Sequence, residues 1–324
     1  MKSFEYTRPT SVQEAVQLLS AQNARALGGG TDLLGIMKDA LLPTDRVVDL
    51  KGIQGLDHIK DDAGTLAIGA LARLGDIASS SLVSQKAPAL AQAAGLVASP
   101  QIRNMGTLGG NLAQKVRCWY FRDADRTDCY KRNGSYCYAV LGASDLHAVF
   151  GGAACFAVHP SDTATALSAL DASVVVAGPK GQRTVPIASF FVGPDTDYLR
   201  ETVLAPDEII TEVRVPPGAL GAPSVFLKAA PRRSIDFART SVGAQVVGTN
   251  VIQTARIALG AVAPTPHRAT KAEAFLEGKS LAADTIAQAA ELAADGAKPL
   301  ASNAYKVPLI KGLVRQALTA LAAR

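Results

Sequence analysis

The stretch "ALGGGTDLL", residues 26–34, lies between a segment with strand-like alternation and a segment with helical spacing. Its three consecutive glycines carry no side chains, so backbone N–H groups there can approach an anion at the start of the helix. The pattern is not a Walker A loop, because no Gly-Lys-Ser/Thr follows, and it is not the dinucleotide motif G-x-G-x-x-G. Taken alone, such a stretch is more often a turn than a ligand site.

A second glycine cluster, "TLGGNL" at residues 107–112, has hydroxyl and amide side chains beside a glycine pair. Two clusters of this kind, both with a threonine beside the glycines, favour a ligand with more than one phosphate. The elements around them are short and alternate between the two types. A strand is expected at residues 3–9, a helix from the capping box of Ser11 and Glu14, and another helix at 87–97.

The second half of the sequence has a simpler pattern and predicts an α+β fold. Residues 173–188 predict a hairpin around a Gly-Pro-Lys-Gly turn, and residues 208–217 predict a strand that two prolines end. Three further strands are expected at 224–230, 240–249 and 255–264, and two or three helices from Lys271 onward. The length suggests two domains, divided in the proline- and glycine-rich stretch 217–223.

Composition excludes several classes of protein. With 48% hydrophobic and 19% charged residues, the chain is expected to be globular. Its 33 basic residues are spread among 28 acidic ones without forming a run, so nucleic-acid binding is not favoured. The longest uncharged apolar run, 148–158, is much shorter than the roughly 20 residues that span a bilayer. Residues 1–20 hold no apolar secretory core, which predicts a cytoplasmic protein.

All four cysteines lie between residues 113 and 158, together with the only tryptophan, Trp119, and several tyrosines. Four thiolates are the ligand set of an all-cysteine iron–sulfur cluster or of a structural zinc ion. Zinc sites usually pair cysteines two to four residues apart, and no such pair is present. Two disulfides are disfavoured without a secretory signal. The aromatic neighbours are expected to shield the thiols from solvent.

The four histidines are not assigned as ligands. His58 and His267 are expected on surface segments, whereas His147 and His159 flank Cys155. No Ser-His-Asp or paired-carboxylate constellation is visible, so nothing in the sequence supports hydrolytic chemistry.

The order and spacing of "ALGGGTDLL", "SPQIRNMGTLGGNL" (99–112) and "HPSDTATALSALDA" (159–172) resemble the FAD-binding medium subunits of the molybdenum hydroxylases, the xanthine dehydrogenase and carbon monoxide dehydrogenase group. The resemblance covers nearly the whole chain. It implies a two-part FAD-binding domain of the vanillyl-alcohol-oxidase type at 1–220. A C-terminal domain of three antiparallel strands and a helical bundle would follow at 221–324.

The resemblance also implies contacts with FAD. Those with the pyrophosphate would come from Ala26, Leu27, Gly28, Gly29, Gly30, Thr31, Asp32, Leu33, Leu34, Thr107, Gly110 and Asn111. Asp162 would bind the adenosine ribose and Ile102 would lie near the flavin ring. By a looser similarity, Ile210 and Lys228 would approach the isoalloxazine or the adenine.

In simpler members of this group the ribose-binding aspartate follows the Gly-Gly-Asn motif closely, whereas here 50 residues separate Asn111 from Asp162. The cysteine-bearing insertion, about 113–158, resembles that of 4-hydroxybenzoyl-CoA reductase and, more closely, that of the bacterial periplasmic aldehyde oxidoreductase. The resemblance implies a 4Fe-4S cluster whose ligands are Cys118, Cys129, Cys137 and Cys155.

The function implied is that of an electron-transfer subunit. A large partner subunit with a molybdenum dinucleotide cofactor would oxidise aldehydes to carboxylic acids, and a small subunit with 2Fe-2S clusters would pass the electrons to FAD. These chains would form a heterotrimer or a dimer of heterotrimers. A protein, a quinone-like molecule or oxygen is expected to replace NAD as acceptor.

Three alternatives remain open at this point. They are a subunit of an aromatic acyl-CoA reductase, a stand-alone flavin oxidase, and a non-catalytic module held together by zinc. Co-export with a signal-bearing partner would place the complex in the periplasm instead of the cytoplasm.

Overall fold

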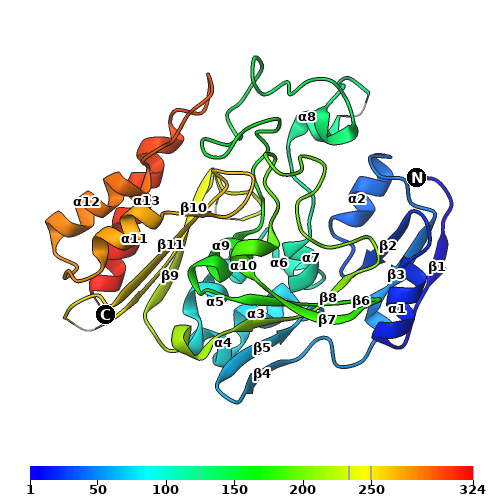
Figure 1. Cartoon of the computed structure of the whole chain (residues 1–324), viewed down its shortest axis with the longest axis horizontal. Coiled ribbons are helices and arrows are strands. Elements are labelled where there is room, and N and C mark those ends of the chain that lie inside the picture. The colour runs from blue at the N-terminus through cyan, green and yellow to red at the C-terminus, as the bar shows by residue number, and fades with distance from the viewer. Residues whose placement is uncertain (124, 233, 249, 324) are drawn as a thin grey trace.

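Three β-sheets with helices packed against them form the frame of the protein (Figure 1). The structure is a computed structural model and describes residues 1–123, 125–232, 234–248 and 250–323. The elements are α+β in arrangement, as the sequence predicts. Within the described residues, none of the helices has the length and apolarity needed to cross a membrane.

The first sheet is small and parallel, with the strand order β1-β3-β2. Its strands are β1 (Glu5–Thr7), β2 (Ala24–Leu27) and β3 (Arg46–Asp49), and its helices are α1 (Val12–Leu19) and α2 (Leu33–Lys38), with the 3-10 turn η1 (Leu50–Gly52) after β3. Ser11 caps α1 by accepting the Glu14 N–H at 3.2 Å. The predicted reciprocal bond is displaced by one residue, because the Glu14 carboxylate accepts the N–H of Thr10.

The second sheet has five antiparallel strands in the order β4-β5-β8-β6-β7. These are β4 (Ile59–Asp62), β5 (Thr65–Gly69), β6 (Ser173–Gly178), β7 (Gly181–Pro186) and β8 (Ile209–Val215). The predicted hairpin is confirmed as β6 and β7. The helices that accompany this sheet are α3 (Leu74–Ser79), α4 (Ser81–Lys86), α5 (Pro88–Gly95), α6 (Pro100–Arg103), α7 (Leu108–Leu112), α9 (Asp162–Ala169) and α10 (Ile187–Phe190).

The third sheet has the order β12-β11-β10-β9 and lies between two layers of helices. Its strands are β9 (Ser224–Ala229), β10 (Thr240–Val247), β11 (Thr254–Gly260) and the two-residue β12 (His267–Arg268), which the sequence did not predict. The helices α11 (Thr270–Leu276), α12 (Ala283–Ala293) and α13 (Lys306–Ala322) belong to this part of the chain, and the 3-10 turn η3 (Pro217–Ala219) precedes it. Gly243 of β10 permits close packing on α9, since a Cβ there would lie 3.0 Å from the Thr165 carbonyl oxygen.

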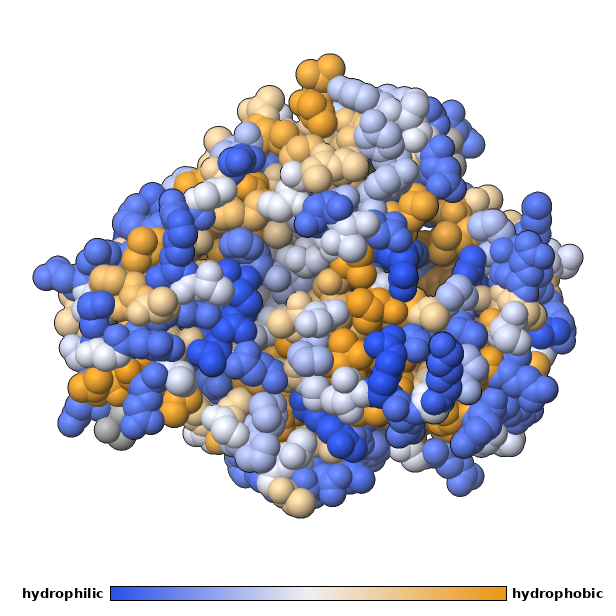
Figure 2. All heavy atoms as spheres, viewed as in Figure 1, coloured by the Kyte–Doolittle hydropathy of each residue, from blue (hydrophilic) through white to orange (hydrophobic). Residues whose placement is uncertain are grey.

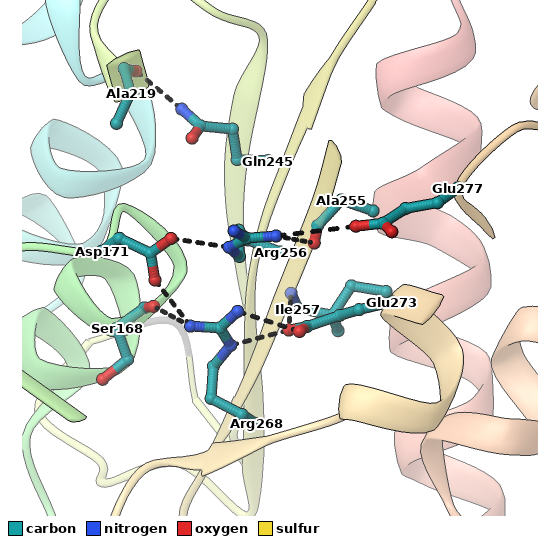
Figure 3. A network of polar contacts seen from close by, with 10 residues as sticks. All are labelled: Ser168, Asp171, Ala219, Gln245, Ala255, Arg256, Ile257, Arg268, Glu273 and Glu277. Carbon is teal, nitrogen blue, oxygen red and sulfur yellow. Dashed lines mark hydrogen bonds and ion pairs between the residues drawn. The ribbon is translucent and has the colours of Figure 1, made fainter. Parts of the chain in front are cut away.

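Charged groups join α9 to the edge of the third sheet (Figure 3). Asp171, directly after α9, binds Arg256 of β11 at 2.6 Å and Arg268 of β12 at 2.7 Å. Arg268 also binds the buried Glu273 of α11, whose carboxylate accepts the N–H of Ile257. The short strand β12 is therefore held in place by ion pairs that no local sequence pattern reveals.

Among its described residues, 113–123 and 125–158, the insertion has little regular structure, with the helix α8 (Trp119–Arg122) and the 3-10 turn η2 (Tyr130–Arg132). It lies at the top of Figure 1, between α2 and the C-terminal helices. Apolar residues reach the surface over this region in Figure 2. Val140, Leu141 and Leu146 of the insertion are exposed, and so is Tyr136.

Candidate functional site

A cleft of about 460 Å³ lies where the two glycine clusters, the start of the insertion and the loop between β9 and β10 meet. Most of the residues expected to contact FAD line this cleft. They are Ala26, Gly28, Gly29, Gly30, Thr31, Asp32, Leu33, Ile102, Thr107, Gly110, Asn111, Asp162 and Lys228. Segments that are far apart in the sequence thus converge on one concave site.

Three of the expected contacts do not line the cleft. Leu27, the last residue of β2, packs against Met37 and Val47. Ile210 is buried in β8 within the core beneath the five-stranded sheet, because successive strand residues point to opposite faces. Leu34 lies on α2 and is partly exposed to solvent.

The two glycine clusters pack directly on each other. Glycine is therefore required at some of these positions because no side chain would fit, and not only because a ligand must approach the backbone. A Cβ on Gly29 would lie 1.8 Å from the Met105 carbonyl oxygen, and one on Gly28 would lie 2.7 Å from the Thr107 hydroxyl. Gly30 has a φ of +73°, in the left-handed region that side chains disfavour. The clusters therefore form one continuous wall of backbone.

The α7 helix begins at this wall and is fixed by side-chain oxygens. The Thr107 hydroxyl accepts the N–H of Gly110 at 3.3 Å. The amide oxygen of Asn111 accepts hydrogen bonds from the Ser161 hydroxyl at 2.5 Å and the Thr163 hydroxyl at 2.6 Å. Asn111 thereby ties α7 to the start of α9, and Gly110 stays exposed in the cleft.

Asp162 forms a buried ion pair with Lys228 at 2.7 Å, and each side chain is only 6–7% exposed. The Lys228 ammonium also donates to the Leu96 carbonyl at 3.0 Å. Burial raises the pKa of Asp162, while the neighbouring Lys228 opposes this effect. The pair offers a fixed carboxylate acceptor and a cation on the wall of the cleft.

Asp32 links the first glycine cluster to the beginning of the insertion. Its carboxylate binds Arg117 and Arg122, both at 2.9 Å, and accepts the N–H of Lys115 at 2.8 Å. A free carboxylate would repel an anionic ligand in this cleft. The two guanidinium groups compensate that charge, so Asp32 holds the wall together instead of facing a phosphate unpaired.

A second anchor of the insertion is Glu201, which sequence reasoning missed. Its carboxylate binds Lys131 at 3.0 Å, with both side chains 6% exposed, and also pairs with Lys115. Further along, the Val149 and Phe150 N–H groups donate to the Val262 carbonyl. The insertion is thus bonded to three distant parts of the chain, at Asp32, Glu201 and Val262.

The four cysteines gather in the insertion and are all free thiols. Cys118, Cys129 and Cys155 share one apolar cluster with Ile36, Val116 and Phe121. Burial raises the pKa of Cys118 to about 12 and that of Cys155 to about 11, and Cys137 lies near enough to add to the rise at Cys155. In the part of the chain that the structure describes, no three potential ligands converge closely enough for a single metal ion.

Aromatic rings of the insertion pack on one another beside Cys118, and their shielding of all four thiols stays a prediction. Trp119 packs edge-on against His147, with ring centres 5.3 Å apart, and Tyr120 stacks on Tyr138 at 5.7 Å. His147 is buried, and its Nε2 lies 3.2 Å from the Cys118 sulfur. Burial lowers the pKa of His147 to about 4, so its imidazole is neutral.

The other histidines are packed more closely than expected. His58 and His267 are half-buried, the first bonded to Glu212 at 2.8 Å and the second stacked on Phe150. His159 is buried beside Phe191. His58 and His267 therefore have partners within the chain, whereas the buried Nε2 of His159 has no hydrogen-bond partner among the described residues.

Lys306, at the start of α13, is a fully buried amine that holds the insertion. It donates to the His147 carbonyl at 3.0 Å and to the Ala261 carbonyl at 2.6 Å. Burial, together with the charge of Arg239, lowers the pKa of this amine to about 7.

We expect this amine to make stability depend on pH. Its folded pKa lies below the ordinary value of 10.5, so the unfolded chain binds more protons between these values and stability rises with pH across that window. Thermal unfolding of wild type and Lys306→Met, compared between about pH 6 and about pH 9, tests this. The wild-type melting temperature should gain roughly a few degrees relative to the variant as the pH rises. Parallel pH profiles for the two proteins would contradict it.

Two protein families together match most of the chain. Residues 2–218 match the FAD binding domain in molybdopterin dehydrogenase, and residues 225–321 match the CO dehydrogenase flavoprotein C-terminal domain. The chain is 40% identical to the aldehyde oxidoreductase FAD-binding subunit PaoB of Escherichia coli K12, over 96% of each chain. It is 33% identical to the carbon monoxide dehydrogenase medium chain of Hydrogenophaga pseudoflava, over 99% of this chain and 98% of the other.

Solved structures show the same architecture. Carbon monoxide dehydrogenase from Hydrogenophaga pseudoflava superposes with a TM-score of 0.79 at 31% identity, covering 99% of this chain and 98% of the other. Quinoline 2-oxidoreductase from Pseudomonas putida 86 superposes with a TM-score of 0.77 at 28% identity, covering 100% and 99%.

Proposed function

Since the chain belongs to the FAD-binding medium subunits of the molybdenum hydroxylases, we propose that it carries electrons for an aldehyde-oxidising complex. The observation that carries this proposal is the 40% identity to the FAD-binding subunit of an aldehyde oxidoreductase, together with a cleft that unites both glycine clusters with Asp162. The alternative is that the complex reduces aromatic acyl-CoA substrates instead of oxidising aldehydes.

We propose that FAD occupies the cleft, where it would supply two-electron redox chemistry. The exposed Gly110 leaves room at the start of α7, and the backbone wall of Gly28 to Gly30 would face the pyrophosphate from the other side. The Asp162 carboxylate would accept hydrogen bonds from ribose hydroxyls. Ile102, on the cleft wall, would contact the flavin ring.

The insertion is proposed to hold a 4Fe-4S cluster on Cys118, Cys129, Cys137 and Cys155. The residues fit such a group, since all four cysteines are free thiols of the insertion, and Cys118, Cys129 and Cys155 share one apolar cluster. Four sulfurs around one zinc would lie about 3.8 Å apart, given Zn–S distances of about 2.3 Å. A cubane cluster separates its ligands more widely.

The partners proposed are a large molybdenum-cofactor subunit and a small 2Fe-2S subunit, in a heterotrimer or a dimer of such trimers. We also propose a division into two domains, residues 1–220 and residues 221–324. The proposed location is the cytoplasm or, by co-export with a partner, the periplasm.

The decisive experiment is metal and flavin analysis of the purified complex. Molybdenum, iron and FAD are expected, whereas a flavin-containing monomer active by itself would favour a stand-alone oxidase, and a colourless zinc protein would favour a binding module.

We expect Gly110→Val to block FAD binding without unfolding the chain. Gly110 is exposed, and a Cβ there would meet only the Thr107 hydroxyl, at 3.0 Å, so the added methyl groups would extend into the cleft. FAD content, measured by absorbance after gel filtration, should fall by roughly tenfold or more, the effect of about 1.4 kcal/mol.

The matched control is Gly35→Val on α2. A Cβ at Gly35 would meet nothing within 4 Å, and the residue does not line the cleft. Gly29→Val is unsuitable for this purpose, because its side chain would collide with backbone. Equal FAD content in the Gly110 and Gly35 variants would refute the placement of the pyrophosphate.

A further inference from the structure

A second cavity, of about 310 Å³, opens beside the cleft. The insertion contributes Trp119 and Leu146 to its walls, and the loop between β9 and β10 contributes Ala238. Five residues line both spaces, namely Arg117, Pro160, Ile235, Asp236 and Phe237. A molecule in this cavity would therefore lie next to whatever fills the cleft.

The walls of the cavity favour a flat, largely apolar molecule. Trp119, Leu146 and Phe237 supply apolar and aromatic surface, and Ile235 and Phe237 are 54% and 45% exposed. The guanidinium of Arg117 lies 5.0 Å from the centre of the Phe237 ring. It adds a positive charge that suits carbonyl oxygens or a developing negative charge.

The size of the cavity selects among electron acceptors. Small-molecule sites span roughly 300 to 1,000 Å³, so this cavity is at the lower limit and suits a molecule of one or two rings. A nicotinamide dinucleotide, with two bases, two riboses and two phosphates, is too large for it.

The cavity also lies toward the end of the cleft where the flavin ring is proposed. The N–H of Ile235 donates to the Ala98 carbonyl at 3.0 Å. Ala98 and Ile102, the proposed ring contact, both line the cleft four residues apart. The loop that walls the cavity therefore touches the ring end of the cleft.

We propose that this cavity binds a quinone, which accepts the electrons that leave the complex. This inference rests on the proposed function. The quinone would take two electrons and two protons from the reduced flavin and leave as the hydroquinone, while the flavin returns to its oxidised form. No bond to the protein forms or breaks.

Trp119 provides a direct test of binding, because it is the only tryptophan of the chain. Duroquinone is a suitable probe, since all its ring positions are substituted and it cannot alkylate the four thiols. Titrating it into the full chain should quench Trp119 fluorescence in a saturable manner. Linear quenching, the mark of random collisions, would overturn the proposal.

Two leucines of the insertion make a matched pair of variants. Leu146 lines the cavity at its rim and Leu141 does not, although both are exposed. Leu146→Glu should weaken duroquinone binding by roughly tenfold, since an apolar wall becomes charged. Leu141→Glu should leave it unchanged. Ala238→Leu, which narrows the cavity from the opposite loop, should have the same effect as Leu146→Glu. Equal binding by all variants would overturn the proposal.

In the intact complex, Leu146→Glu should raise the KM for duroquinone by a similar factor and leave the KM for aldehyde and the rate with ferricyanide unchanged. FAD content, measured on the same samples, distinguishes a failure of the proposed function from a failure of the quinone site. A complex that lacks FAD contradicts the proposed function. A complex that holds FAD but cannot reduce duroquinone, and passes electrons only to oxygen or a protein, contradicts the quinone site alone.

Discussion

A Cys155→Ala chain, purified with its partner subunits, should contain about four fewer iron atoms per trimer than the wild type. Cys155 is buried in the same apolar cluster as Cys118 and Cys129, so no water ligand can easily replace the lost sulfur. The cluster should therefore be lost as a whole. Iron analysis and the electron paramagnetic resonance signal of the reduced complex measure the effect, and alanine at Cys118, Cys129 or Cys137 should give the same result.

Val116→Ala is the matched control, because Val116 belongs to the same cluster and the substitution removes comparable apolar volume without removing a thiol. This variant should retain its iron and lose only the stability that a small cavity costs, about 1 kcal/mol. Unchanged iron in the cysteine variants, or zinc in place of iron in the wild type, would refute the 4Fe-4S assignment.

Asp162→Ala should both destabilise the chain and release FAD. Removing this carboxylate leaves the Lys228 ammonium, only 7% exposed, without its partner, which typically costs roughly 3–5 kcal/mol. Losing a charged acceptor of ribose hydrogen bonds should weaken FAD binding by roughly one to two orders of magnitude. Chemical denaturation of the FAD-free chain and flavin titration measure the two effects separately.

The double variant Asp162→Ala/Lys228→Met distinguishes these two causes. Methionine removes the stranded charge and keeps the length of the side chain, so most of the lost stability should return while the FAD affinity remains low. Should the double variant recover wild-type affinity for FAD, Asp162 would act only by pairing with Lys228, and the ribose contact would be wrong.

The local elements of this fold follow from the sequence, because their signals lie within a few residues. The turn at 179–180 predicts the β6–β7 hairpin, and Ser11 predicts the start of α1. The strand β12 gives no such signal. It consists of His267 and Arg268 and depends on Asp171, which lies about a hundred residues earlier in the chain.

The sequence predicts many residues of the candidate site, but it does not predict the contacts that hold them together. The glycine clusters stand out as motifs, the family resemblance points to Asp162, and the cleft brings them together. The pairing of Asp162 with Lys228, the compensation of Asp32 by two arginines and the packing of Gly29 on Met105 are contacts between distant segments. Such contacts depend on how the sheets pack, which residue spacing does not encode.

The anchoring of the insertion limits how it can be gained, lost or transplanted. Excising residues 113–158 would strip the buried Glu201 of both its lysines and Asp32 of both its arginines, and would leave the buried Lys306 without the carbonyl of His147. A relative without the insertion needs different residues at these positions. Grafting the cysteine loop onto such a relative would therefore require the recipient to acquire Glu201 and Lys306 as well, so the insertion and its anchors form one structural unit.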